Sequence, residues 1–266
     1  MADNQYLPFK SQIKDIVRHN DLEFTFKMSF KGKVLPGQFF EVSIPQVGEA
    51  PISVSGIDEK AETVDLTIRR VGKVTAELFQ HKNNDVFFLR GPYGNGFKVD
   101  DYKNSELVII AGGTGVSPVR SVIEYFSQNL QELKSFTLIA GFKSPKDILF
   151  RADFERWQKN FNVTLTTDNN GGDTQYKQGL VTEYIPALQV KDSKTAKAIT
   201  VGPPAMMRFS IEALLKYGFV EQNIWLSHER RMCCGIGKCG HCRINDVYVC
   251  IDGPVFNYAQ TKHLTD

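Results

Sequence analysis

ELVIIAGGTGVSPVRSVIEYF, residues 106–126, joins an apolar run to a glycine-rich turn and then to a stretch with helical spacing. The apolar run predicts a buried strand, and the residues after the turn predict a helix that begins near Pro118. Glycines let backbone N–H groups approach a phosphate, and the helix N-terminus adds partial positive charge. The predicted contacts are Gly112, Gly113, Thr114, Gly115 and Pro118. A glycine-rich turn between a strand and a helix can also serve packing alone, and the spacing here is not the usual GxGxxG.

Downstream of this turn, strand-like runs alternate with helical stretches. The strand-like runs are SFTLIAGF (135–142), VTLTTD (163–168) and KAITVG (197–202), and the helical stretches are ILFRADFERWQKNF (148–161), LVTEYIPAL (180–188) and AMMRFSIEALLKYG (205–218). Strands that alternate with crossover helices predict an α/β domain with a parallel sheet.

Upstream of residue 99 the pattern is different. Short runs such as FTFKMSF (24–30) and VDLTIRR (64–70) alternate apolar and polar residues between glycines and prolines, which predicts an antiparallel β barrel. One helix is expected at 74–82. The predicted domains are a barrel at 1–99, an α/β domain at 100–226 and a small lobe with the tail at 227–266.

Composition excludes some classes of partner. The 266 residues include 32 basic and 30 acidic side chains, without a block of like charge that would bind nucleic acid. No apolar run approaches the roughly 20 residues of a membrane span. The first residues lack a signal-peptide pattern, so we expect a cytoplasmic protein.

All five cysteines lie between residues 232 and 250. In a reducing compartment such a cluster favours metal binding or redox chemistry over disulfides. Read from the second of two adjacent cysteines, the spacing is CxxxxCxxC with a distant fourth cysteine, which is the plant-type [2Fe-2S] pattern. The predicted ligands are Cys234, Cys239, Cys242 and Cys250, which leaves Cys233 without a role. A zinc site that includes His241 or His228 is the alternative.

Six motifs together resemble the ferredoxin reductase family of flavoproteins. They are PISVS (51–55), RRVGKVT (69–75), GPYGNGF (91–97), AGGTGVSP (111–118), GFKSPKDILF (141–150) and VGPPAMM (201–207). The resemblance implies that the barrel binds FAD and that the α/β domain binds NAD(P)H. It places Ser53 at the reactive edge of the flavin as the catalytic residue. The implied FAD contacts are Pro51, Ile52, Ser53, Thr67, Ile68, Arg69, Gly72, Lys73, Val74 and Thr75.

The nucleotide contacts extend to the VGPPAMM turn and to the end of the next strand. We expect Gly202 and Pro203 to lie near the nicotinamide, and Asp168 to accept hydrogen bonds from ribose hydroxyls, which slightly favours NADH. Asp168 can equally stabilise its own turn. Two positions depart from the family pattern, because Ala50 replaces a common Arg and Val201 replaces a common Cys.

The context ERRMCCGIGKCGHC (229–242) narrows the resemblance to electron-transfer subunits. Such subunits occur with dihydroorotate dehydrogenase, with cytoplasmic hydrogenases, where they are called gamma, and with anaerobic sulfite reductase. The residues here resemble the electron-transfer subunit of anaerobic sulfite reductase most. This implies a partner catalytic subunit that carries the terminal redox centre, and sulfite as the final acceptor. A zinc-stabilised or redox-sensing binding module, which is not an enzyme, is the alternative of another class.

Overall fold

The computed structural model of the protein describes residue 4 and residues 6–264. The chain divides into two compact units. One contains the described residues up to Phe97 together with His228–Val255, and the other contains Lys98–Ser227 and Phe256–His263. The cysteines thus belong to the same unit as the barrel, whereas the sequence predicted a separate lobe from residue 227. Among the helices of the described part, none is long and apolar enough to cross a membrane.

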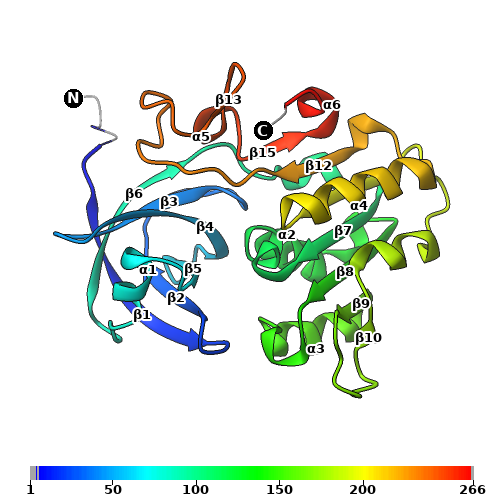
Figure 1. The fold of residues 1–266 in the computed structure, drawn as a ribbon, viewed down its shortest axis with the longest axis horizontal. Coiled ribbons are helices and arrows are strands. Elements are labelled where there is room, and N and C mark those ends of the chain that lie inside the picture. The colour runs from blue at the N-terminus through cyan, green and yellow to red at the C-terminus, as the bar shows by residue number, and fades with distance from the viewer. Residues whose placement is uncertain (1–3, 5, 265–266) are drawn as a thin grey trace. The chain divides into compact units, whose positions relative to one another are not determined.

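Six antiparallel strands form a closed barrel in the first unit, in the order β1-β2-β5-β4-β3-β6 (Figure 1). Their bounds are β1 Phe9–Arg18, β2 Glu23–Ser29, β3 Phe39–Ile44, β4 Gly48–Asp58, β5 Thr63–Arg69 and β6 Val86–Tyr93. Alternate residues such as Phe24, Phe26 and Met28 pack in the barrel core, as the period of two requires. The helix α1, Lys73–Leu78, buries Leu78 against that core.

The second unit contains a seven-stranded sheet in the order β10-β9-β8-β7-β11-β12-β15. Its strands are β7 Glu106–Gly112, β8 Ser135–Phe142, β9 Asn162–Thr167, β10 Lys177–Gln178, β11 Lys197–Val201, β12 Ile224–Ser227 and β15 Val255–Asn257. All pairings from β10 to β12 are parallel. The predicted architecture of a barrel followed by a parallel-sheet α/β domain is therefore confirmed.

Helices cover the sheet and make its crossovers (Figure 1). They are α2 Val116–Gln128, α3 Arg151–Asn160, α4 Pro204–Tyr217 and the 3₁₀ helix η5 Val181–Ala187. Residues of α4 and η5 pack with Val108 and Ile110 of β7 in one apolar cluster. The stretch predicted as a helix at 180–188 is thus a 3₁₀ helix, and it contains Pro186, which has no N–H for an α-helical bond.

The remaining elements are short. They are η1 Val99–Tyr102, η2 Gly113–Gly115, η3 Leu130–Glu132, η4 Pro145–Asp147, η6 Glu221–Asn223, β13 Arg243–Ile244, β14 Val247–Tyr248, α5 Val249–Asp252 and α6 Tyr258–Thr261. Within the first unit, the stretch that bears β13 and α5 runs beside β6 (Figure 1). The residues 232–250, which we call the cysteine segment, lie in this stretch.

Candidate functional site

The residues predicted to hold the flavin lie on β4, on β5 and at the start of α1. β4 and β5 pair antiparallel. A Cβ atom added at Gly48, the first residue of β4, would lie 3.1 Å from Cγ2 of Val74, so α1 begins against the start of β4. The barrel therefore gathers three segments that are separate in the sequence on one part of its wall.

Side chains along these strands point in alternate directions. Ile52 and Val54 of β4 pack against or within the barrel core, and Ile68 of β5 is fully buried in it. Pro51 and Ser53 therefore point outwards. Ile52 and Ile68 can contact a bound cofactor only through backbone atoms, because their side chains fill the core. The Ser53 hydroxyl lies on the outer face, as its predicted role requires.

The turn that leads into α1 is organised by a side chain that we expected to touch FAD. The Thr75 Oγ1 accepts hydrogen bonds from the backbone N–H groups of Val71 and Gly72, at 2.9 and 3.0 Å. This hydroxyl shapes the turn, and the N–H groups of Lys73 and Val74 are those that the helix start can present to a phosphate. A Cβ added at Gly72 would meet no atom within 4 Å, so there is space for a ligand over this turn.

Two other predicted FAD contacts also have partners within the protein. The Thr67 Oγ1 shares hydrogen bonds of 2.7 and 2.8 Å with the hydroxyls of Ser55 and Thr25. The Arg69 Nε lies 3.3 Å from Oε1 of Glu23. Thr67 and Arg69 thus have partners within the barrel, and a ligand bound along β5 would have to share or replace these interactions.

The structure brings together the two glycine turns of the predicted nucleotide site. They follow the parallel strands β7 and β11, so they lie at the carboxyl edge of the sheet. A Cβ at Gly115 would lie 2.4 Å from the Val201 carbonyl oxygen, and one at Gly112 would lie 3.3 Å from Pro203. The contact at Gly115 is with backbone and requires glycine there, whereas the contacts at Gly112 are with the Pro203 and Met206 side chains. Pro118 is buried in the first turn of α2.

Gly113 is different from its neighbours, because its φ is +54° and an added Cβ would meet nothing within 4 Å. Its backbone borders open space at the start of α2, where a phosphate would be stabilised by the helix N-terminus. Asp168 is exposed and follows β9, which lies two strands from β7 at the same edge of the sheet. The geometry of this edge suits a dinucleotide, whose ribose and phosphates are held at separate points.

The four predicted ligand cysteines stand in two pairs. The pKa of the Cys239 thiol is lowered by a hydrogen bond from the His241 backbone and further by Cys234. Burial raises the pKa of Cys250 to about 12, and its hydrogen bond with Cys242 adds to that effect. No three His, Cys, Asp or Glu side chains among the described residues are grouped as ligands of one ion. Two pairs of thiols suit two iron atoms, each of which needs two protein ligands in a [2Fe-2S] cluster.

Backbone N–H groups of the cysteine segment already point at sulfur atoms. Gly237 donates to Cys250 Sγ at 3.2 Å, and Lys238 donates to Cys234 Sγ at 3.4 Å. Such bonds stabilise thiolates and so favour metal ligation. Cys233 and Cys239 are both exposed, so exposure does not separate the omitted cysteine from the predicted ligands.

Sequence reasoning missed the barrel residues that hold the cysteine segment. Arg90 of β6 is 5% exposed and donates from Nη2 to the Cys233 carbonyl at 3.0 Å and from Nη1 to the Cys234 carbonyl at 3.2 Å. A Cβ at Gly235 would lie 2.5 Å from the ring of Tyr93, so the backbone of the segment rests on that ring. No local signal marks these residues, because their partners are more than 140 positions away.

Two carboxyl groups interact with Arg90. Glu49 accepts two of its hydrogen bonds, at 2.9 and 2.7 Å, and this raises the pKa of Arg90. Burial alone would raise the pKa of Glu49, but the hydrogen bond from Arg90 lowers it. Glu41 is fully buried, and burial raises its pKa to about 8 although Arg90 opposes that effect. Glu41 is therefore mostly neutral at pH 7, and one positive and one negative charge remain.

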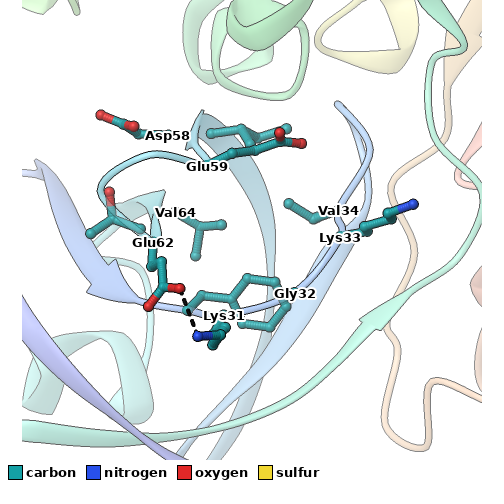
Figure 2. Close-up of a pocket in the computed structure, with 11 residues that line it drawn as sticks. Lys31, Gly32, Lys33, Val34, Asp58, Glu59, Glu62 and Val64 are labelled. Carbon is teal, nitrogen blue, oxygen red and sulfur yellow. Dashed lines mark ion pairs between the residues drawn. The ribbon is translucent and has the colours of Figure 1, made fainter.

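The barrel also has a hollow of about 220 Å³ between the β2–β3 connection and the β4–β5 turn (Figure 2). Lys31 and Glu62 at its edge form an ion pair of 3.0 Å, and their side chains are 84% and 53% exposed. None of the predicted site residues lines this hollow. It is therefore separate from the predicted flavin, nucleotide and cysteine sites.

Two domain families match the chain. Residues 109–212 match the oxidoreductase NAD-binding domain, and residues 229–262 match the iron-sulfur cluster binding domain of dihydroorotate dehydrogenase B. The fold is similar to that of the NADH-dependent reduced ferredoxin-NADP oxidoreductase, with a TM-score of 0.79, 22% identity and coverage of 94% of this chain and 88% of that one. A ferredoxin NADP⁺ reductase of Neisseria gonorrhoeae with bound FAD and NADP gives 0.69 at 18% identity, with 82% and 97% covered.

Curated relatives cover almost the whole chain. The sulfhydrogenase 1 subunit gamma of Pyrococcus furiosus is 38% identical, with 91% of this chain and 84% of the relative covered. A probable dihydroorotate dehydrogenase B electron transfer subunit of Methanocaldococcus jannaschii is 32% identical, with 94% and 89% covered.

Fold, turns and paired cysteines define an NAD(P)H-oxidising flavoprotein subunit that transfers electrons and carries an iron-sulfur domain. Its cofactors are FAD, an iron-sulfur cluster and NAD(P)H, as the sequence predicted. Within that class, the chain belongs to the family of the sulfhydrogenase gamma subunits and the dihydroorotate dehydrogenase B electron transfer subunits. Neither the domain matches nor these relatives point to sulfite reductase.

Proposed function

We propose that this chain takes electrons from NADH and passes them, through FAD on the barrel and a [2Fe-2S] cluster on the cysteine segment, to a separate catalytic subunit. The observation that carries the proposal is the outer face of β3, β4 and β6. Phe39 of β3 pairs with Ser53 of β4 on one side and with Tyr93 of β6 on the other. Directly paired residues share a face, so Ser53 and Tyr93 both point outwards.

The spacing on this face suits electron transfer between two cofactors. Neighbouring strands lie about 4.8 Å apart, so the backbones of Ser53 and Tyr93 are about 10 Å apart. Tyr93 is 7% exposed, packs near Phe39 with ring centroids 5.7 Å apart and supports Gly235 of the cysteine segment. Ser53 and the Tyr93 ring beneath the cysteine segment thus lie on the same outer face of the barrel, which supports electron transfer from a flavin at Ser53 to a cluster on that segment.

Each residue has a defined task in this proposal. FAD held at the barrel would supply the conversion of a two-electron hydride into single electrons, and a [2Fe-2S] cluster held by the cysteines would carry these one at a time. Ser53 hydrogen-bonds the reactive edge of the flavin. The N–H groups of Lys73 and Val74 hold the FAD pyrophosphate, and Gly113 lets the nucleotide phosphates approach the start of α2. Cys234 with Cys239, and Cys242 with Cys250, each hold one iron.

The partner is the least constrained part of the proposal. The relatives that are 38% and 34% identical are gamma subunits of sulfhydrogenases, which supports a hydrogenase-type catalytic partner. Sulfite as the final acceptor stays a prediction from the sequence. NADH rather than NADPH is proposed because Asp168 would accept ribose hydroxyls and repel a 2′-phosphate.

Anaerobic purification of the full chain tests the proposal. We expect the absorbance of a flavin, and iron and acid-labile sulfide in equal amounts to each other. NADH should reduce the flavin and the cluster faster than NADPH does. A colourless protein that contains zinc would contradict the proposal and favour the binding-module alternative. Mass spectrometry of the co-purifying catalytic chain then separates a hydrogenase, a dihydroorotate dehydrogenase and a sirohaem sulfite reductase.

A further inference from the structure

Arg90 joins the barrel wall to the cysteine segment. Its guanidinium is 5% exposed and uses its two terminal nitrogens on the carbonyls of Cys233 and Cys234, while Nε and Nη2 bind the Glu49 carboxylate. Nη1 also donates to the Tyr93 hydroxyl at 3.3 Å. A planar guanidinium that is held on both sides has little freedom to turn, so the two carbonyls are fixed relative to β6.

The two carbonyls belong to the adjacent cysteines whose roles the spacing left ambiguous. With both held, Cys233 is exposed and Cys234 is half-buried, and Cys234 Sγ accepts the Lys238 N–H. A shift of one residue would exchange the two thiols and would place a side chain where Gly235 packs on the Tyr93 ring, 2.5 Å from an added Cβ. The register in which Cys234 points inwards therefore depends on a barrel residue as well as on the glycines of the cysteine segment.

In the ion pair of Arg90 and Glu49, the positive charge lies nearer to the cysteine segment than the negative charge does. Arg90 directly contacts the backbone of Cys234, whereas Glu49 is 35% exposed and binds the guanidinium from β4. A buried positive charge stabilises the reduced, more negative state of a nearby cluster. The screened carboxylate opposes this effect from the other side of Arg90.

We propose that Arg90 is a positioning residue that fixes the backbone of the cysteine segment against the barrel and raises the reduction potential of the cluster bound there. This inference rests on the proposed function, because it requires a cluster on these cysteines. Glu49 limits the effect of the Arg90 charge, so the two residues have opposite influences on the potential.

Redox titration of the cluster by electron paramagnetic resonance tests the proposal in the full, anaerobically purified chain. Arg90→Gln should lower the equilibrium constant for cluster reduction by at least about tenfold, which is about 59 mV for a one-electron couple. Glu49→Gln should shift the potential in the opposite direction, because it leaves the Arg90 charge uncompensated. Arg90→Lys should keep the potential near the native value but change the g-values, since an ammonium cannot hold both carbonyls as the planar fork does.

The matched control is Arg120→Gln. Arg120 forms a similar pair with Asp153, at 2.7 Å with side chains 17% and 13% exposed, in the other unit. The Arg120→Gln variant should leave the reduction potential and the g-values of the cluster unchanged. Shifts of the same sign in Arg90→Gln and Glu49→Gln would overturn the proposal, because loosened structure alone moves both variants alike. If Arg90→Gln loses its cluster, the Glu49→Gln variant tests the proposal alone. A raised potential in that variant supports the proposal, and a lowered potential overturns it. A native chain without an iron-sulfur signal would instead refute the proposed function.

Discussion

Replacing Gly113 by Asp tests whether the turn between β7 and α2 receives the nucleotide phosphates. A Cβ added at this position meets no heavy atom within 4 Å, so the backbone leaves space for a side chain to begin there. The φ of +54° is left-handed, a region that Asn and Asp adopt more readily than other residues. Gly113→Asn has the same shape without the charge and is the matched control.

The difference between the two variants isolates an electrostatic effect. Both share a backbone cost of about 1 kcal/mol. A carboxylate about 6 Å from one phosphate charge costs about 2.8 kcal/mol at an effective dielectric constant of about 20. If mobile ions screen half of that, about 1.4 kcal/mol remains, which is about a tenfold difference in Kd.

The assay is the rate of flavin reduction as a function of NADH concentration, followed anaerobically by stopped flow. We expect half-saturation of Gly113→Asp at about ten times the NADH concentration needed by Gly113→Asn, with a difference that shrinks as salt is added. The limiting rate should change little, because Gly113 contacts phosphates and not the reacting atoms. Equal half-saturation of the two variants at low salt would refute the phosphate assignment.

Three further outcomes are expected. Gly115→Ala places a Cβ 2.4 Å from the Val201 carbonyl oxygen and should lower the free energy of unfolding by about 1–3 kcal/mol, measured by urea denaturation; an unchanged midpoint would contradict the close approach of these turns. Cys239→Ser should abolish cluster absorbance but leave flavin reduction by NADH, whereas Cys233→Ser should do neither; the reverse result would mean that the ligand register is wrong. Glu41→Gln should flatten the pH dependence of stability. Burial raises the Glu41 pKa from 4.5 to about 8, so the folded chain keeps a proton that the unfolded chain releases, and the free energy of unfolding falls as pH rises between these values. If the urea denaturation midpoints of the native chain and of Glu41→Gln change with pH in the same way from pH 5 to 8, the Glu41 carboxyl is not buried in its neutral form.

Several site predictions depended on local pattern, and they stay predictions. The run before Gly112 is apolar throughout because β7 is covered on both faces, and such strands need no alternation. The glycine at 115 is explained by a backbone contact that a sequence can only suggest, and Gly112 faces the Met206 side chain. The directions of Ile52 and Ile68 were missed, since the period of two places them in the core and leaves only their backbone for a ligand.

The sequence by itself determined the order of barrel and parallel sheet, the turn after β7 and the spacing of the cysteines. These follow from periodicities and short motifs that act within a few residues. Only the tertiary structure decided that the cysteine segment belongs to the barrel unit and that Arg90 and Tyr93 hold it. Such contacts join residues more than 140 positions apart, and their free energy comes from burial and paired charge that exist only once the barrel has closed.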